Sequence, residues 1–145
     1  MATVKTIKEE REAIAKLLAD TVGLKGMYDH EPQQLGQTPV ATVYFAGFGI
    51  AEPANFRMAK QLRQYQIRLY VALEGDWGGA QELHGTVFEK LWEKVISIKR
   101  LNDNTNVIIS HTGEAKVEMI TDDQERKYIL GTIMVETEHR SPYTA

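Results

Sequence analysis

The sequence predicts an α+β domain with a mainly antiparallel sheet and two helices packed on one of its faces. Two segments carry apolar residues at helical spacing, and several others alternate apolar and polar residues. These segments follow one another in the order helix, strands, helix, strands. No repeat or linker divides residues 1–145, so we expect a single domain.

The first helix is predicted over residues 7–21. Thr6 and Glu9 have the spacing of a capping box, and two glycines soon after the apolar stripe end the helix. Within that stripe, Glu10 and Arg11 stand where another apolar residue is expected. Either their stems carry the charged groups out to water, or the pair faces a neighbouring subunit.

Two segments with alternating polarity predict the next strands. Residues 40–48 alternate, and residues 63–73 do so more clearly, with one core-facing side and one wetter side. Met27 and Tyr28 can form only a short edge strand, because two prolines follow them. The connection at residues 47–60 is too long for a tight hairpin.

The second helix is predicted to follow a turn at residues 74–79. Its apolar arc, over residues 83–98, covers well over half of its circumference, whereas a helix on the surface of a monomer needs only about 100°. Either the helix lies deep in a groove, or a second chain covers its far edge. Three more strands are expected, over residues 107–111, 116–121 and 127–138, before a loose tail.

Composition excludes several classes of protein. The 145 residues are 43% apolar and 26% charged, which is enough to build a core without metals or disulfides. A formal charge of −3 argues against a dedicated nucleic-acid binder. The absence of cysteine excludes a disulfide scaffold and a thiol nucleophile. No apolar run approaches the ~18 residues of a membrane helix, so we expect a soluble intracellular protein.

Candidate catalytic groups are few. Asp29, His30 and Glu31 are adjacent, but neighbours in an extended chain point to opposite sides, so a solvated loop is expected there. His84 lies within the apolar arc of the second helix and is expected to be a neutral, hydrogen-bonded core residue. No phosphate loop, nucleophile elbow, zinc helix or dinucleotide fingerprint is present. We therefore predict that the protein is not an enzyme and holds no metal or cofactor.

Large apolar side chains occupy connections in which a monomer rarely exposes them. The connection at residues 47–60 carries four of them, Trp77 lies in a predicted turn, and Trp92 flanks the wide arc of the second helix. Exposed patches of this kind mark interaction sites. The alternative is that the connection folds back and buries its own aromatic rings. We predict a subunit or partner interface that comprises Phe48, Ile50, Phe56, Met58, Trp77 and Trp92.

The order of these elements resembles the tail-terminator proteins of long-tailed bacteriophages, also called tail-completion or minor tail proteins, such as the lambda protein U group. The resemblance covers nearly the whole chain and rests on layout and length, without a catalytic motif. It is carried by Gly23 after the first helix, Tyr28 and Pro32 in an extended segment, Pro39 before the first strand, the alternating strand at residues 65–73 and the helix at residues 83–98. The long apolar connection at residues 47–60 departs from the family pattern.

The resemblance implies a structural role in the virion, at the head–tail junction of a particle made in the host bacterial cytoplasm. Family members form a hexameric ring that caps the tail tube, stops its polymerisation and offers a docking surface to the head connector. The implied partners are other copies of the chain, the major tail tube protein and a head-completion or connector protein. Genomic DNA passes through the ring without specific binding, and no membrane is involved. On charge alone, we expect Asp122, Asp123 and Glu125 to face the lumen.

The sequence is also compatible with two other functions. One is another head–tail neck or head-completion protein with a related fold. The other is a small α+β enzyme or ligand-binding domain that uses His84 or the acidic cluster at residues 29–31.

Overall fold

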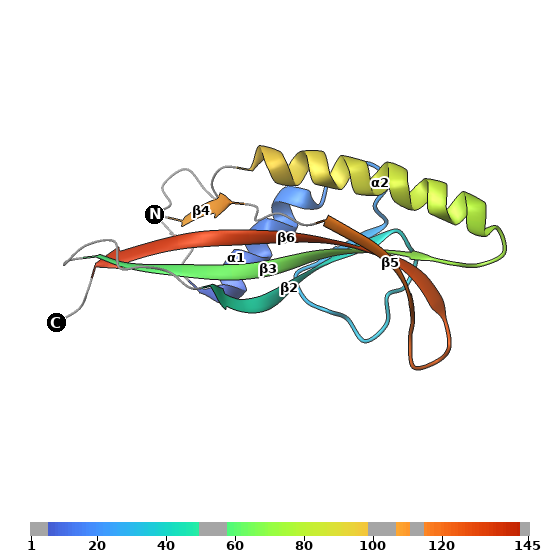
Figure 1. Cartoon of the computed structure of the whole chain (residues 1–145), viewed down its shortest axis with the longest axis horizontal. Coiled ribbons are helices and arrows are strands. Elements are labelled where there is room, and N and C mark those ends of the chain that lie inside the picture. Colours follow the sequence, from blue (N-terminus) through green and yellow to red (C-terminus); the bar gives the residue numbers. More distant parts are fainter. Residues whose placement is uncertain (1–5, 50–57, 99–106, 111–114, 143–145) are drawn as a thin grey trace.

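The structure, a computed structural model, describes residues 6–49, 58–98, 107–110 and 115–142. Its elements confirm the predicted α+β class and the order helix, strands, helix, strands (Figure 1). They are α1 (Ile7–Leu18), β1 (Gly26–Tyr28), β2 (Val40–Gly49), β3 (Met58–Ala72), α2 (Trp77–Ser97), β4 (Val107–Ser110), β5 (Ala115–Thr121) and β6 (Lys127–Pro142).

The described strands form one sheet in the order β1-β2-β3-β6-β4. β5 also pairs with β6, so that β4 and β5 follow one another along the same edge of that strand. Every pairing is antiparallel except that of β1 with β2. The sheet is therefore mainly antiparallel, as predicted, with one short parallel addition at its edge.

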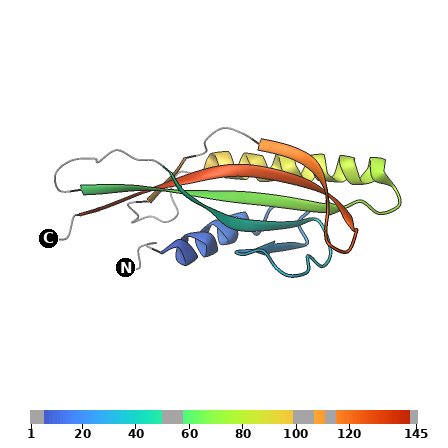
Figure 2. The same cartoon turned by 60° about the horizontal axis from the view of Figure 1, so that its bottom comes forward.

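The two longest strands, β3 and β6, lie side by side over their whole length (Figure 2). Their register runs from the pair Met58 and Pro142 to the pair Ala72 and Tyr128. Both strands are longer than predicted: β3 takes up part of the expected connection, and β6 takes up part of the expected loose tail. The added residues lack clear alternation, and it is the pairing between the two strands that holds their backbones extended.

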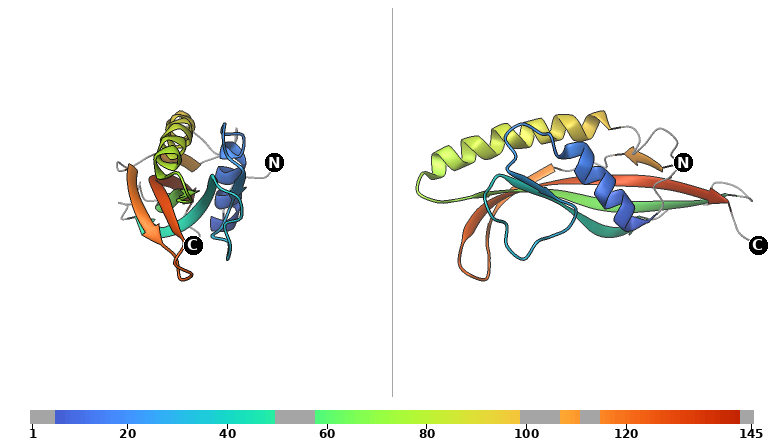
Figure 3. Two further views of the ribbon diagram at one scale, coloured as in Figure 1. Left: turned by 90° about the vertical axis from the view of Figure 1, so that its right-hand side faces the viewer. Right: turned by 180° about the vertical axis from the view of Figure 1, so that it is seen from behind.

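The core lies between the sheet and the two helices, which pack on the same face of the sheet (Figure 3). α1 contacts β1 and β2, whereas α2 contacts β3 and β6. The buried core residues are Ile14, Ala15 and Leu18 of α1, Val87, Leu91 and Val95 of α2, Ala41 and Val43 of β2, Tyr65, Ile67 and Leu69 of β3, and Ile133 and Val135 of β6. This arrangement confirms the predicted packing.

The start of α1 is capped as predicted, because the Thr6 hydroxyl accepts a hydrogen bond from the Glu9 N–H at 3.0 Å. The helix ends at Leu18, three residues before the predicted end. Gly23 follows with a φ of +95°, and a Cβ at this position would come within 2.7 Å of Val87 on α2. Glycine thus allows the chain to turn close against the second helix.

α2 begins earlier than predicted. Asp76 is its N-cap and accepts a hydrogen bond from the Gly79 N–H at 2.9 Å, which makes Trp77 the first helical residue and not part of a turn. The sequence did not indicate this earlier start, because Gly78 and Gly79 are residues of low helix propensity. Leu83 and Ile96, at the edges of the wide apolar arc, are 43% and 39% exposed, so the helix does not lie deep in a groove.

Candidate functional site

Phe48, near the end of β2, has an aromatic side chain that is 58% exposed. A β-bulge between Phe45 and Gly47 leaves Ala46 without a partner and brings Phe48 to the same side of the strand as Phe45. The two phenyl rings meet edge to face with centroids 5.2 Å apart, and Phe45 meets Tyr65 in the same way at 5.5 Å. A row of aromatic rings therefore runs from the core to the surface.

A second exposed aromatic ring lies at the start of α2. Trp77 is 42% exposed, and the Lys127 ammonium lies 5.4 Å from the centroid of its ring. The start of α2 and the Phe48 end of β2 lie toward opposite ends of the long axis of the molecule (Figure 1). The exposed part of the predicted interface thus forms two separate patches.

The other predicted interface residues are placed differently. Trp92 is half-buried and packs against the core, so most of its ring contributes to the fold. Met58 begins β3, but its side chain lies outside the described part of the structure. Ile50 and Phe56 also lie outside the described residues. The interface as a whole stays a prediction.

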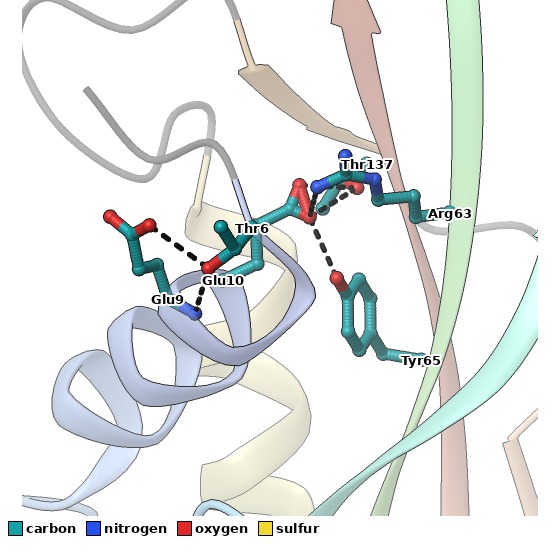
Figure 4. Close-up of polar contacts among 6 residues, drawn as sticks. All are labelled: Thr6, Glu9, Glu10, Arg63, Tyr65 and Thr137. Carbon is teal, nitrogen blue, oxygen red and sulfur yellow. Dashed lines mark hydrogen bonds and ion pairs between the residues drawn. The ribbon is translucent and has the colours of Figure 1, made fainter.

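The side chain of Glu10 is fully buried, and Figure 4 shows its contacts with three side chains of the sheet. Its carboxylate accepts hydrogen bonds from the Tyr65 hydroxyl at 2.7 Å and from the Thr137 hydroxyl at 3.1 Å. Arg63 Nη1 lies 3.2 Å from the same carboxylate. Both interpretations of Glu10 made from the sequence are therefore wrong: it reaches neither water nor a neighbouring subunit, because strands β3 and β6 supply its partners.

This cluster also changes the chemistry of Tyr65. Burial, together with the hydrogen bond to the Glu10 carboxylate, raises the pKa of its hydroxyl far above the usual range. The hydroxyl therefore stays protonated and remains a hydrogen-bond donor. In this setting the four side chains join α1 to the sheet and do not form an open site.

A groove of about 440 Å³ separates α2 from the edge strand β5. Its apolar lining is made of Phe88 on the helix, Val117 and Met119 on β5, and Ile129 on β6. Val117 and Met119 are 57% and 62% exposed. This groove could not be predicted from the sequence, because the pattern of residues 116–121 indicates a strand but not which edge of the sheet that strand forms.

His84 lies in the wall of this groove and is 2% exposed, as expected of a core residue. Its ring stacks on Phe88 with centroids 5.3 Å apart, and its Nε2 lies 3.3 Å from the Leu69 carbonyl oxygen. Burial lowers the pKa of the imidazole, which favours the neutral form. Both rings lie directly above Gly131, where a Cβ would come within 2.5 Å of Phe88 and 2.8 Å of His84.

The three adjacent residues at 29–31 do not converge on one point. His30 Nδ1 lies 2.7 Å from the Asp29 carboxylate, and this hydrogen bond lowers the pKa of the carboxyl group. The chain bends at residues 29 and 30, and Glu31 contacts the sheet instead of this pair.

Glu31 is half-buried rather than solvated and holds its segment against the face of the sheet opposite the helices. Its carboxylate accepts hydrogen bonds from the Thr42 hydroxyl at 2.6 Å, Arg68 Nη1 at 3.1 Å and the Tyr70 hydroxyl at 3.2 Å. Burial and the Glu31 charge raise the pKa of Tyr70 to about 12. The prediction of a solvated loop is wrong for this residue, because its partners come from β2 and β3.

The acidic residues at the β5–β6 turn have a local structural role. The Asp122 carboxylate accepts hydrogen bonds from the backbone N–H groups of Gln124 and Arg126, at 2.9 and 2.8 Å, and from the Arg126 guanidinium at 2.9 Å. Glu125 has a φ of +62°, as a tight turn requires. Asp123 and Glu125 are exposed. The expectation that these three acidic residues face a lumen stays a prediction.

Among the described residues, no group of three or more His, Asp and Glu side chains could hold a metal ion. Within the same part of the chain, neither helix has the length and apolar character needed to cross a bilayer. Comparison with protein-family models and with curated proteins finds no match to this sequence.

Proposed function

We propose that this protein is a tail terminator of a long-tailed bacteriophage, a subunit of a ring that caps the tail tube and joins it to the head connector. The observation that carries the proposal is the pair of separate exposed aromatic patches, Phe48 near the end of β2 and Trp77 at the start of α2, which are displaced from one another along the long axis of the molecule (Figure 1). A closed ring needs contacts in which two different patches of each subunit meet. A subunit with two separate patches has that arrangement.

The fold adds support, because the order of helices and strands is the one that the resemblance to tail terminators implies. In this proposal the ring contacts the major tail tube protein on one side and a head-completion or connector protein on the other. The formal charge of −3 per subunit suits a passage through which DNA moves without being held, since tight non-specific binding requires basic surfaces.

The test replaces the exposed ring and leaves the core intact. Phe48→Ser removes an aromatic side chain that is 58% exposed, so we expect the melting temperature to change little and ring formation to be lost. Rings are scored by electron microscopy and sedimentation velocity, with and without the tail tube protein.

Val22→Ser is the matched control. Val22 is 74% exposed and lies outside the predicted interface, so this variant should form rings as the wild type does. The proposal fails if the wild type stays monomeric in the presence of the tube protein. A large loss of stability in Phe48→Ser would instead show that Phe48 belongs to the core.

A further inference from the structure

The outer edge of β5 pairs with no other strand in the described part of the chain. Among the described residues, β5 pairs only with β6, and all its side chains are exposed except that of Ile120, which is half-buried. An open edge strand presents backbone N–H and C=O groups to which another strand can add.

Two backbone hydrogen bonds fix which groups point outward. The Asp122 N–H donates to the Arg126 carbonyl oxygen, and the Leu73 N–H donates to the Lys127 carbonyl oxygen, each at 2.9 Å. Even-numbered residues of β6 therefore bond to β5, and odd-numbered ones bond to β3, because the ladder alternates. It follows that the N–H and C=O groups of Ala115, Val117 and Met119 point away from the sheet.

The side chains of β5 divide by face. Val117 and Met119 lie beside the apolar groove, on the same side of the sheet as the helices. Lys116 and Glu118 lie on the opposite face, where they contribute to a polar hollow. Lys116 and Glu118, which carry opposite charges, thus flank Val117 in the sequence.

We propose that β5 pairs antiparallel with β5 of a second copy of this chain, about a two-fold axis through Val117. In this register each Val117 lies opposite the Val117 of the other copy, and each Ala115 lies opposite Met119. Each Lys116 then lies opposite the Glu118 of the other copy, so the dimer contains two cross-strand pairs of opposite charge.

Charge selects this register over its neighbours. An axis through Glu118 would place two carboxylates directly opposite one another, and an axis through Lys116 would do the same with two ammonium groups. An axis through Met119 would place Glu118 opposite Ile120, and Lys116 would lie opposite Asp122, a turn residue that Arg126 already contacts. In the chosen register the two Val117 side chains lie opposite one another on the groove side of the sheet, with the Ala115 and Met119 pairs beside them.

This dimer uses residues that the proposed ring interface does not, and it does not depend on that proposal. Two seven-residue strands bury less surface than the ~1,200 Å² of a standard stable interface, so the dimer should be weak and concentration-dependent. Sedimentation equilibrium from micromolar to millimolar protein is the first measurement, and dimers should appear toward the upper end.

Cysteine substitution measures the register, because the natural chain contains no cysteine. Directly opposed residues in a hydrogen-bonded antiparallel pair have Cα atoms about 5.5 Å apart, which a disulfide can span. Under mild oxidation we expect Val117→Cys to cross-link into dimers efficiently, whereas Glu118→Cys and Met119→Cys should cross-link far less.

A charge exchange tests the two pairs. Glu118→Lys and Lys116→Glu each place like charges opposite one another and should weaken the dimer roughly tenfold. The double variant Lys116→Glu/Glu118→Lys restores both pairs and should recover the wild-type dissociation constant. Glu93→Lys, on the exposed side of α2, is the control for a change in net charge alone and should leave it unchanged.

Two outcomes would overturn the inference. One is a protein that stays monomeric throughout the concentration range, or that forms rings without cross-linking at position 117. The other is preferred cross-linking at position 118 or 119, which would show a different register. The ring proposal is tested separately, by ring formation in the Phe48→Ser variant.

Discussion

At the scale of single residues, Glu10 is the most informative position in the molecule. Its charge lies in the interior, and the groups that bind it come from strands 55 and 127 residues away in sequence. A buried carboxylate is tolerated only when such partners compensate for the loss of water. Sequence patterns show that a charge interrupts the apolar stripe, but they cannot identify partners that only the tertiary fold brings near.

Replacing this carboxylate should destabilise the protein strongly. Glu10→Gln removes the charge that Arg63, Tyr65 and Thr137 contact, and we expect the free energy of unfolding to fall by about 3 kcal/mol. Urea denaturation measures the change. Glu12→Gln is the control: Glu12 is half exposed and lies 3.8 Å from Lys8, so its effect should stay within about 0.5 kcal/mol. Equal stability of the two variants would contradict the role assigned to Glu10.

His84 should make stability depend on pH. Burial lowers its pKa in the folded state, so between that value and about 6.5 the unfolded chain binds more protons than the folded one. The stabilising contribution is complete above pH 6.5 and is lost as the pH falls through the folded-state pKa. We expect His84→Gln to show a smaller loss of unfolding free energy between pH 7 and pH 5 than the wild type. Identical losses would exclude His84 as the cause.

At the scale of elements, α2 and β6 approach closely because Gly131 lacks a side chain beneath Phe88 and His84. A methyl group there would collide with two stacked rings. Gly85, on α2, is different: a Cβ at this position would meet nothing within 4 Å. An added methyl group would therefore disturb the helix–sheet contact at position 131 but not at position 85.

Gly131→Ala should destabilise the protein by about 1–3 kcal/mol, because an overpacked core shifts its side chains away from preferred rotamers. Gly85→Ala should instead stabilise it by roughly 0.5–1 kcal/mol, since alanine has the higher helix propensity. Thermal unfolding of both variants measures the two effects. If Gly131→Ala unfolds at the wild-type temperature, the rings above it are free to move aside.

Elements with strong local signals were predictable from the sequence. The Thr6 cap located the start of α1, and the alternation in residues 63–73 located most of β3. β1 was harder, because three residues carry too little pattern to reveal a parallel partner. The same limit applies to the candidate site: exposed aromatic residues could be proposed from the sequence, but the groove beside β5 depends on strand order, which is set by non-local pairing.

At the scale of the whole molecule, the two tryptophans report on different regions. Trp77 is exposed at the start of α2, whereas Trp92 packs against the core. Ring assembly through the Trp77 end should therefore change the environment of one indole much more than that of the other.

Single-tryptophan variants test this expectation. In Trp92→Phe, where only Trp77 fluoresces, acrylamide quenching should decrease when rings assemble with the tail tube protein. In Trp77→Phe, which retains only Trp92, quenching should stay nearly constant. A decrease of the same size in both variants would point to a general change in conformation rather than to a contact at the start of α2.

β6 is the last strand in chain order but lies inside the sheet, so the core can be completed only when synthesis of the chain is nearly finished. Ile133 and Val135 complete a core whose other members are translated much earlier, and Thr137 is needed to enclose Glu10. Until β6 emerges, the edge of β3 that pairs with it stays open, and α2 lacks part of the sheet surface on which it packs. The nascent polypeptide is therefore most prone to aggregation late in synthesis, when chaperones would matter most.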